Sequence, residues 1–283
     1  MRPFFEGWYY KQQFNGKTLA VIPGRSDDGA FIQVITDNNS YFIPYNISEY
    51  KKDRTLQIGE NYFSDSGIIL KVKHNDISIY GELKYSGLIP IQGDIMGFFR
   101  FFPMECRHGI ISMKHDVSGE IILNGEKYDF NNGTGYIETD SGYSFPESYS
   151  WVHSNDFKAE CSITAAIAKI PFAGFNFWGC ICVVWLNGKE YRLATYKGAK
   201  ILRCENGMME IKQGKYNLTV NVNRQHAQNL PAPKSGLMKR VIKESASCPA
   251  DFLFTENGRV VFSGESKNTS YEFEMDIGIK GKT

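Results

Sequence analysis

The sequence has little excess charge of either sign and no long hydrophobic run. Its 32 Lys and Arg residues and 31 Asp and Glu residues leave a net charge of +1, so no overall field favours nucleic acid as a partner. The longest apolar run, CICVVWL at residues 180–186, is too short to span a bilayer and is typical of a buried strand. Charged residues near the start leave no room for a signal peptide. We therefore expect a cytoplasmic protein without a transmembrane segment or a nucleic-acid partner.

Familiar catalytic and metal-binding signatures are also missing. The chain contains no phosphate-binding Walker loop, Gly-x-Gly-x-x-Gly turn, His-Glu-x-x-His helix or Gly-x-Ser-x-Gly elbow. The six cysteines are scattered, and no second ligand pair stands at zinc-like spacing from Cys180 and Cys182. We expect reduced thiols, with this pair buried on one side of a strand, and no metal site.

Asn-Gly pairs and alternating polarity indicate a β-rich fold. Asn-Gly is the strongest short hairpin signal, because both residues tolerate the positive φ of a type I′ turn. The chain has six such pairs, which begin at Asn15, Asn124, Asn132, Asn187, Asn206 and Asn257. Between them lie stretches of period two such as YNLTVNVN at residues 216–223. We predict an all-β protein built from antiparallel β-barrels or sandwiches with little helix.

Two domains and one short helix complete the predicted organisation. A barrel of eight to ten short strands uses about 100 to 150 residues, so the chain supplies two such units. The Gly- and Pro-containing stretch GYSFPESYSW favours a division into domains 1–146 and 147–283. The segment SGLMKRVIKES, Ser235–Ser245, follows a Pro-containing loop and predicts a short helix across a barrel mouth.

Three clusters mix aromatic and ionisable side chains, and these clusters supply the candidate site residues. They are FFEGWYYK, GFFRFFPMECRHGIISMKH and GTGYIETDSGYSFPESYSWVHSNDF. The candidate catalytic residues are Glu138, Asp140, His108 and His153, and the candidate substrate-binding residues are Glu6, Trp8, Tyr10, Glu105, Tyr136 and Trp151. If GYIETD is a strand, Glu138 and Asp140 share one face at roughly 7 Å. Two negative charges at such a short distance raise the pKa of both carboxyl groups.

Each candidate also has a purely structural interpretation. Glu138 and Asp140 suit a solvated strand face, since exposed strand faces are normally polar. Glu6 suits a structural ion pair with Lys11 or Arg100 as well as a catalytic role. The histidines suit hydrogen-bonded structural positions, and the tryptophans suit the core. The coincidence of three clusters is what favours a functional site.

With these motifs the sequence resembles the tocopherol cyclase-like family. The resemblance rests on RPFFEGWYYK, FFRFFPMECRHGIISMKH, GYIETDSGYSFPESYSWVHSNDF, AAIAKIPFAG, GKEYRLATYKGAKI and LPAPKSGLMKRVIKES, in this order from about Arg2 to Phe273. It implies a lipocalin-related double β-barrel akin to the carotenoid hydratases. Two positions differ from the family's usual pattern: Ser141 stands where a Trp is common, and His153 where a Gln is common.

The reaction that the resemblance implies is ring closure of a prenylated hydroquinone to a chromanol. An acid protonates the alkene, and the phenol oxygen captures the tertiary carbocation, so the reaction needs a protonated carboxyl group and a dry pocket with aromatic walls. No redox cofactor or metal is required. Glu138 or Asp140 is the expected acid, with Glu6 and Glu105 in reserve. His108 or His153 would orient or deprotonate the phenol. Tyr136, Trp8 and Trp151 would form the aromatic wall.

Two other functions fit the same residues. A lipocalin-like carrier would hold a hydrophobic small molecule in a barrel mouth without converting it. Paired carboxylates beside aromatics also suit a glycosidase, although the family resemblance does not support carbohydrate chemistry. For both the cyclase and the carrier, the expected partner is a hydrophobic small molecule.

Overall fold

The protein is almost entirely β-structure. The computed structural model describes residues 3–75, 77–172, 174–223, 227–275 and 279–280, and 72% of the described residues lie in strands and 4% in short helices. The predicted all-β fold with little helix is therefore confirmed. The chain forms two compact units. Unit 1 contains Met1–Ile91, His108–Ser144 and Leu230–Arg240, and unit 2 contains Gln92–Arg107, Phe145–Asn229 and Val241–Thr283. We keep the division after residue 146 as a proposal. Two segments depart from such a simple division, since residues 92–107 belong to unit 2 and residues 230–240 belong to unit 1.

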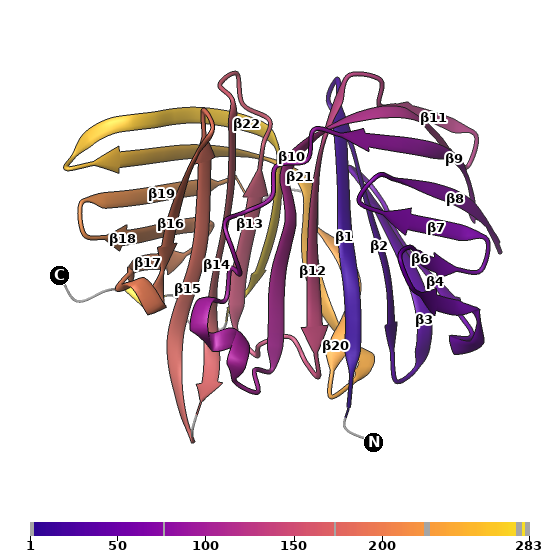
Figure 1. Ribbon diagram of the computed structural model, residues 1–283, viewed down its shortest axis with the longest axis horizontal. Helices are drawn as coiled ribbons and strands as arrows, with labels where there is room; N and C mark the ends of the chain where they lie inside the picture. Colours follow the sequence, from indigo (N-terminus) through magenta and orange to yellow (C-terminus); the bar gives the residue numbers. More distant parts are fainter. Residues whose placement is uncertain (1–2, 76, 173, 224–226, 276–278, 281–283) are drawn as a thin grey trace. The chain divides into compact units, whose positions relative to one another are not determined.

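The first antiparallel sheet follows the order β4-β3-β2-β1-β12-β10-β9-β8-β7-β6-β5, with β11 paired to β10 (Figure 1). Its strands are β1 (Phe5–Phe14), β2 (Lys17–Ser26), β3 (Gly29–Thr36), β4 (Ser40–Tyr45), β5 (Tyr50–Lys52), β6 (Leu56–Ile58), β7 (Asn61–Ser64), β8 (Gly67–His74), β9 (Ile77–Ser86), β10 (Cys106–Leu123), β11 (Glu126–Asp129) and β12 (Gly133–Gly142). Two 3₁₀ helices, η1 (Ile47–Glu49) and η2 (Gly97–Phe101), lie in the connections. Strands β1, β12 and β10 are adjacent, which brings the first and second sequence clusters beside the third.

The second antiparallel sheet follows the order β16-β15-β14-β13-β22-β21-β19-β18-β17-β23, with β20 paired to β21. Its strands are β13 (Tyr149–Ser154), β14 (Cys161–Phe172), β15 (Phe175–Leu186), β16 (Lys189–Ala194), β17 (Lys200–Glu205), β18 (Met208–Gln213), β19 (Tyr216–Val222), β20 (Gln228–Lys234), β21 (Leu237–Glu256), β22 (Arg259–Glu274) and β23 (Ile279–Lys280). The 3₁₀ helix η3 (Thr195–Lys197) connects β16 to β17.

Five of the six Asn-Gly pairs form the predicted two-residue hairpins. In each, both residues have positive φ, as at Asn187 (48°) and Gly188 (77°) between β15 and β16. The sixth prediction, at Asn132-Gly133, is wrong. There β11 pairs with β10 rather than β12, and the carboxylate of Asp129 accepts hydrogen bonds from both nitrogens of Asn131. A longer connection, shaped by these side-chain hydrogen bonds, replaces the tight turn.

The predicted helix at Ser235–Ser245 is also wrong. Ser235 and Gly236 form a turn with positive φ values of 50° and 79° between β20 and β21, and β21 then continues as a strand. Its side chains alternate, since Val241 is 63% exposed and the next residue, Ile242, is 3% exposed. Pairing of β21 with β22 and β20 outweighs the weak helical spacing of the apolar residues.

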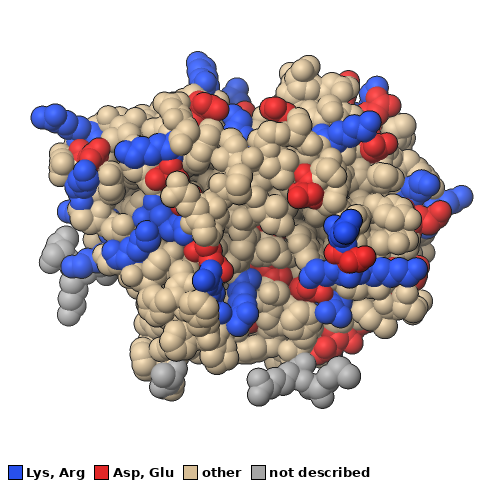
Figure 2. Space-filling model, viewed as in Figure 1, with Lys and Arg blue, Asp and Glu red and all other residues tan. Residues whose placement is uncertain are grey.

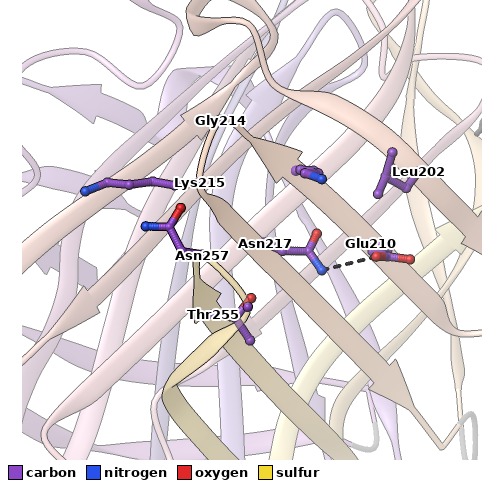
Figure 3. A pocket seen from close by; sticks show the side chains of 9 residues that line it. Leu202, Glu210, Gly214, Lys215, Asn217, Thr255 and Asn257 are labelled. Carbon is purple, nitrogen blue, oxygen red and sulfur yellow. Dashed lines mark hydrogen bonds between the residues drawn. The ribbon is translucent and has the colours of Figure 1, made fainter.

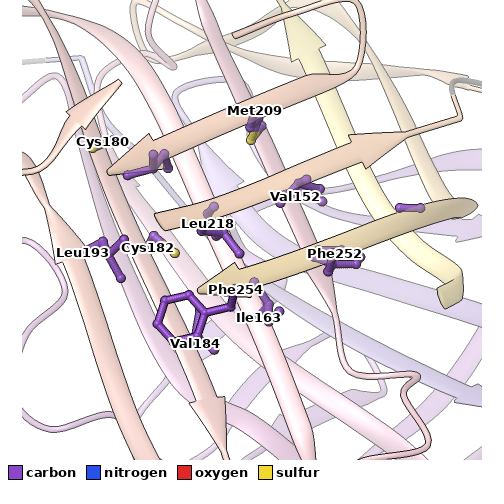
Figure 4. Packing of buried hydrophobic residues seen from close by; sticks show 14 of the residues in the cluster. Val152, Ile163, Cys180, Cys182, Val184, Leu193, Met209, Leu218, Phe252 and Phe254 are labelled. Atoms are coloured by element: carbon purple, nitrogen blue, oxygen red, sulfur yellow. The ribbon is translucent and has the colours of Figure 1, made fainter. Parts of the chain in front are cut away.

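Each unit has its own hydrophobic core. In unit 1 the core includes Leu19, Val21, Ile68, Ile121 and Ile137, and Tyr10 packs among them. In unit 2, Leu218 and Phe254 from neighbouring strands pack against Cys182 (Figure 4). Cys180 and Cys182 are both buried in the core. The predictions that this pair is buried in a strand and that residues 216–223 form an alternating strand are thus confirmed.

Candidate functional site

A buried polar cluster lies on strands β10 and β12 of unit 1. Ile137 of β12 points into the core of unit 1, so Tyr136, Glu138 and Asp140 lie on the opposite face of the strand. The adjacent strand β10 contributes His108 to the same face. The expectation that Glu138 and Asp140 share one strand face is confirmed, and the fold adds an imidazole between them.

The ring of His108 lies between the two carboxylates. Its Nδ1 is 3.0 Å from Asp140 Oδ1, and its Nε2 is 3.5 Å from Glu138 Oε2. The side chain of His108 is 13% exposed, that of Glu138 7% and that of Asp140 24%. The fold therefore places three ionisable side chains in contact in a largely buried place.

Tyr136 fixes the inner end of the cluster. It is fully buried, and its hydroxyl group donates a 2.6 Å hydrogen bond to Oε2 of Glu138. That oxygen therefore accepts the Tyr136 hydrogen bond and faces His108 Nε2 as well. We infer that Glu138 acts as an acceptor, while Asp140 is the more accessible carboxyl group of the two.

Strand β1 places two further side chains beside the cluster. Tyr9 is in register with Glu138, and Lys11 is in register with Tyr136, so these pairs share one face of the sheet. Tyr9 is 7% exposed and Lys11 only 1%. The sequence analysis missed both as site residues and considered Lys11 only as a partner of Glu6. Tyr9 and Lys11 are two residues apart on a strand, so the sequence already indicated that they share one face.

Glu6 lies apart from this cluster. It is in register with Ser141 of β12, whereas the neighbouring Gly7 is in register with Asp140. Because successive residues of a strand face opposite sides, the side chains of Glu6 and Asp140 lie on opposite faces of the sheet. Its carboxylate accepts 2.7 Å hydrogen bonds from Arg25 Nε, the Tyr50 hydroxyl group and Lys52 Nζ. Burial would raise the pKa of Glu6, but the hydrogen bonds from Lys52 and Tyr50 and the two positive charges outweigh burial and lower that pKa. Glu6 is thus an ionised structural partner in the arrangement shown.

The ion pairs of Glu6 differ from the predicted ones. The sequence analysis named Lys11 or Arg100, whereas the pairs in the structure are with Arg25 and Lys52. The reason is the topology, since β2 and β5 bring these two cations to Glu6 from elsewhere in unit 1. The opening cluster of the sequence is therefore an ion-pair site.

Trp8 and Tyr10 share the strand face of Glu6. Trp8 packs against the core of unit 1, with Lys52 Nζ 4.4 Å from the ring centroid. Tyr10 is 3% exposed, its ring stacks on Tyr85 at 6.3 Å, and burial raises its pKa. The structure therefore separates Glu6, Trp8 and Tyr10 from Glu138 and Asp140, because they point to opposite faces of the same sheet.

The remaining candidates belong to unit 2. His153 and Trp151 are buried on β13, with ring centroids 6.5 Å apart. His153 Nε2 lies 3.5 Å from Ser162 Oγ. Trp151 is in register with Glu272 of β22, whose carboxylate accepts a hydrogen bond from the Tyr149 hydroxyl group. Glu105 is partly buried in the segment before β10.

The three groups that could surround a metal ion are those of the unit 1 cluster. Among the described residues, His108, Glu138 and Asp140 offer ligand atoms within 4.8 Å of one another. Each ring nitrogen of His108 already faces a carboxylate oxygen, so a cation would have to displace one of these contacts.

A shallow depression lies elsewhere, on the outer face of the second sheet. It measures about 360 Å³ and is lined by Glu210, Lys212, Lys215, Asn217, Thr255 and their neighbours. Asn217 Nδ2 donates a 3.1 Å hydrogen bond to Glu210 across it (Figure 3). Most of its lining residues are polar or charged, and they include none of the predicted site residues. It is therefore different from the aromatic-lined pocket that the sequence analysis predicts.

The fold and the cluster define a double lipocalin-like β protein with a buried imidazole–carboxylate site. The chain belongs to the tocopherol cyclase-like family, whose sequence profile matches residues 70–272. No curated protein matches the sequence. Among the described residues, no helix is both long and apolar enough to cross a membrane.

Solved structures share this fold at very low sequence identity. CghA with Sch210972 has a TM-score of 0.63 at 9% identity, covering 96% of this chain and 89% of that chain. Kievitone hydratase from Nectria haematococca has a TM-score of 0.55 at 10% identity, covering 97% and 89%. A protein from Nitrosomonas europaea assigned as AttH has a TM-score of 0.54 at 10% identity, covering 97% and 93%. These similarities establish the lipocalin-like fold.

Proposed function

We propose that the protein is an enzyme that starts the cyclisation or hydration of a prenyl double bond by donating a proton from the Asp140–His108 pair. The observation that carries the proposal is the imidazole of His108 held between two carboxylates, 3.0 Å from one and 3.5 Å from the other. Membership in the tocopherol cyclase-like family supports this chemistry. A fold shared with an enzyme named a hydratase supports the hydration alternative.

Asp140 is the proposed donor. Its side chain is 24% exposed whereas that of Glu138 is 7% exposed, so Asp140 is the carboxyl group that a bound alkene reaches. Glu138 accepts the Tyr136 hydrogen bond and faces the other nitrogen of His108. This contact holds the imidazole ring and its charge in place while the proton between His108 Nδ1 and Asp140 is delivered.

The proposed step balances without a co-reactant. The proton leaves the Asp140–His108 pair and forms a C–H bond at the less substituted alkene carbon, which leaves a tertiary carbocation. The phenol oxygen of the same molecule bonds to the cationic carbon, and the phenol proton returns to Asp140 directly or through His108. The product is an isomer of the substrate. If water is the nucleophile instead, the product gains one water. The rings of Tyr9 and Tyr136 on this face are suited to stabilise the cation.

Replacing Asp140 tests the assignment directly. Purified protein is incubated with a panel of prenylated hydroquinones, and products are resolved by mass and retention time. We expect an isomer or a hydrate from the wild-type protein and a loss of about 10²- to 10⁴-fold in kcat for Asp140→Asn, the range typical of a lost general acid. Asp116→Asn makes the same chemical change at an exposed position of β10 and should keep full activity.

Two outcomes would contradict the proposal. Full activity of a folded Asp140→Asn variant would remove Asp140 from the mechanism. Recovery of bound but unchanged compound from the wild-type protein would identify a carrier. Thermal unfolding of each variant separates a lost proton donor from a lost fold.

A further inference from the structure

Unit 2 carries a cluster of aromatic rings that plays no part in the proposed chemistry. We name it the aromatic patch. It is made by η2 and the residue after it, by the ends of β14 and β15, and by η3, and its members are Phe98, Phe99, Phe101, Phe102, Phe172, Phe175, Phe177 and Tyr196. In Figure 1, η2 lies beside the lower ends of β14 and β15.

Ring contacts join the segments of the patch. The centroid of Phe99 lies 6.0 Å from that of Phe177 and 5.7 Å from that of Phe172. Phe98 meets the ring of Tyr196 edge-on at 6.2 Å. Gly97 has a φ of 56°, and a Cβ atom there would lie 2.6 Å from the Tyr196 ring. A side chain at this position would therefore push η2 away from η3.

Hydrogen bonds hold the segment that carries η2 on unit 2. Arg192 of β16 donates through Nη1 to the Asp94 carbonyl group at 2.8 Å and through Nη2 to the Gln92 carbonyl group at 2.7 Å. The Tyr196 hydroxyl group donates to the Ile95 carbonyl group at 2.9 Å. The rings of the patch are thus presented by a fixed backbone.

Several of these rings are exposed. Phe101 is 74% exposed, Phe175 57%, Phe98 51% and Phe102 38%. Four large apolar side chains exposed together in one place are unusual on a protein surface and mark an interaction site. The rings that contact each other beneath them are better buried, so the patch has a packed base and an apolar outer layer.

The charges in the patch are all positive. The segments 97–102, 169–178 and 195–199 contain Arg100, Lys169 and Lys197 and no acidic residue. Arg100 and Lys197 are exposed, and the Arg100 guanidinium lies 4.6 Å from the centroid of the Phe101 ring. Lys169 pairs at 3.4 Å with Glu147, which lies outside these segments. On the face in Figure 2, the lower end of the part that contains β14 and β15 shows no charged side chains, and Lys, Arg, Asp and Glu side chains all lie above it.

From this combination we propose that the aromatic patch docks on the surface of an anionic lipid bilayer. Aromatic side chains are favoured at the depth of the lipid headgroups, where an apolar ring enters the bilayer and its surroundings stay hydrated. Lys and Arg beside them are attracted by the negative surface potential of anionic lipids. Exposed rings with cations and no acid among them suit such a surface. The proposal does not depend on the catalytic assignment.

Vesicle sedimentation tests the docking surface. We expect the full-length protein to sediment with vesicles of phosphatidylcholine mixed with phosphatidylglycerol, and to bind phosphatidylcholine alone more weakly. The double variant Phe98→Ser, Phe101→Ser should lower the partition coefficient by more than about tenfold, because two exposed rings no longer enter the lipid. Neutralising Arg100 and Lys197 to Gln should cost about fivefold per cation on the mixed vesicles.

The control variant Tyr62→Ser, Tyr80→Ser removes two aromatic rings of unit 1 that are 41% and 42% exposed, and it should bind like the wild-type protein. The proposal is overturned if the wild-type protein binds neither vesicle, or if the control variant loses as much binding as the patch variant. It is also overturned if analytical ultracentrifugation shows a dimer that the patch variant alone abolishes, since the patch would then join two copies of the chain.

Discussion

His115 is a buried histidine of β10 that lies outside the proposed active site. It is 2% exposed, its Nδ1 is 3.1 Å from Ser112 Oγ, and its ring packs 4.6 Å from that of Tyr85. Burial lowers the pKa of His115 to about 3. The folded protein therefore keeps this ring neutral at pH values at which the unfolded chain binds a proton, near pH 6.5 and below.

The sign of the resulting pH dependence follows from proton binding. Between about pH 6.5 and pH 3 the unfolded state binds the proton and the folded state does not, so stability falls as the pH falls. We expect His115 to remove about 2 kcal/mol of the free energy of unfolding between pH 7 and pH 5. Urea unfolding at both pH values should show that His115→Gln flattens this dependence relative to the wild-type protein. Equal pH dependence in the two proteins would refute the assignment.

The geometry of the proposed active-site cluster depends on contacts between strands. Glu138 and Asp140 are two residues apart, so their common strand face could be predicted from spacing alone. The position of His108 could not, because it requires β10 to lie beside β12 and to be aligned so that the ring falls between the carboxylates. At this scale the sequence identifies the residue types, while pairing between distant segments sets their geometry.

At the scale of elements, turns were the most predictable feature. Asn-Gly pairs act locally, and five of six form the expected hairpins. The helix predicted at Ser235–Ser245 fails because long-range pairing of β21 overrides local spacing. The face of β1 that points into the core could not be predicted either, because aromatic residues occur on both faces of that strand. Without the position of the core, Glu6 could not be assigned to a different face from Tyr9. Register, which local sequence does not determine, explains most of the differences.

Two glycines of strand β10 and its following turn offer a matched test of local strain. Gly125 has a φ of 85° and open space around it, whereas Gly119 has a φ of 119° and a Cβ there would lie 2.2 Å from the Glu82 carbonyl oxygen. Gly125→Ala should cost about 1 kcal/mol in the free energy of unfolding, because only the backbone is strained. Gly119→Ala should cost more than about 3 kcal/mol, because β9 must also move. Similar losses in urea unfolding would show that the close approach of β9 and β10 is not as described.

Across the whole molecule, charge is balanced and finely mixed. Lys and Arg side chains lie near Asp and Glu side chains over much of the face in Figure 2, in agreement with a net charge of +1. The function is therefore expected to reside in local sites. One is the imidazole–carboxylate cluster of unit 1, and the other is the aromatic patch of unit 2. A proton donor for prenyl lipids and a lipid-docking surface would suit one enzyme, although each is tested independently.

The central claim is that this cluster donates a proton to a carbon–carbon double bond. The most direct measurement is the mass of the product formed in D₂O from a prenylated hydroquinone. A proton from the Asp140–His108 pair exchanges with solvent, so the account predicts one carbon-bound deuterium per product molecule, retained after return to H₂O and absent from recovered substrate. A product formed without carbon-bound deuterium would contradict it, as would an unchanged rate of incorporation in folded Asp140→Asn.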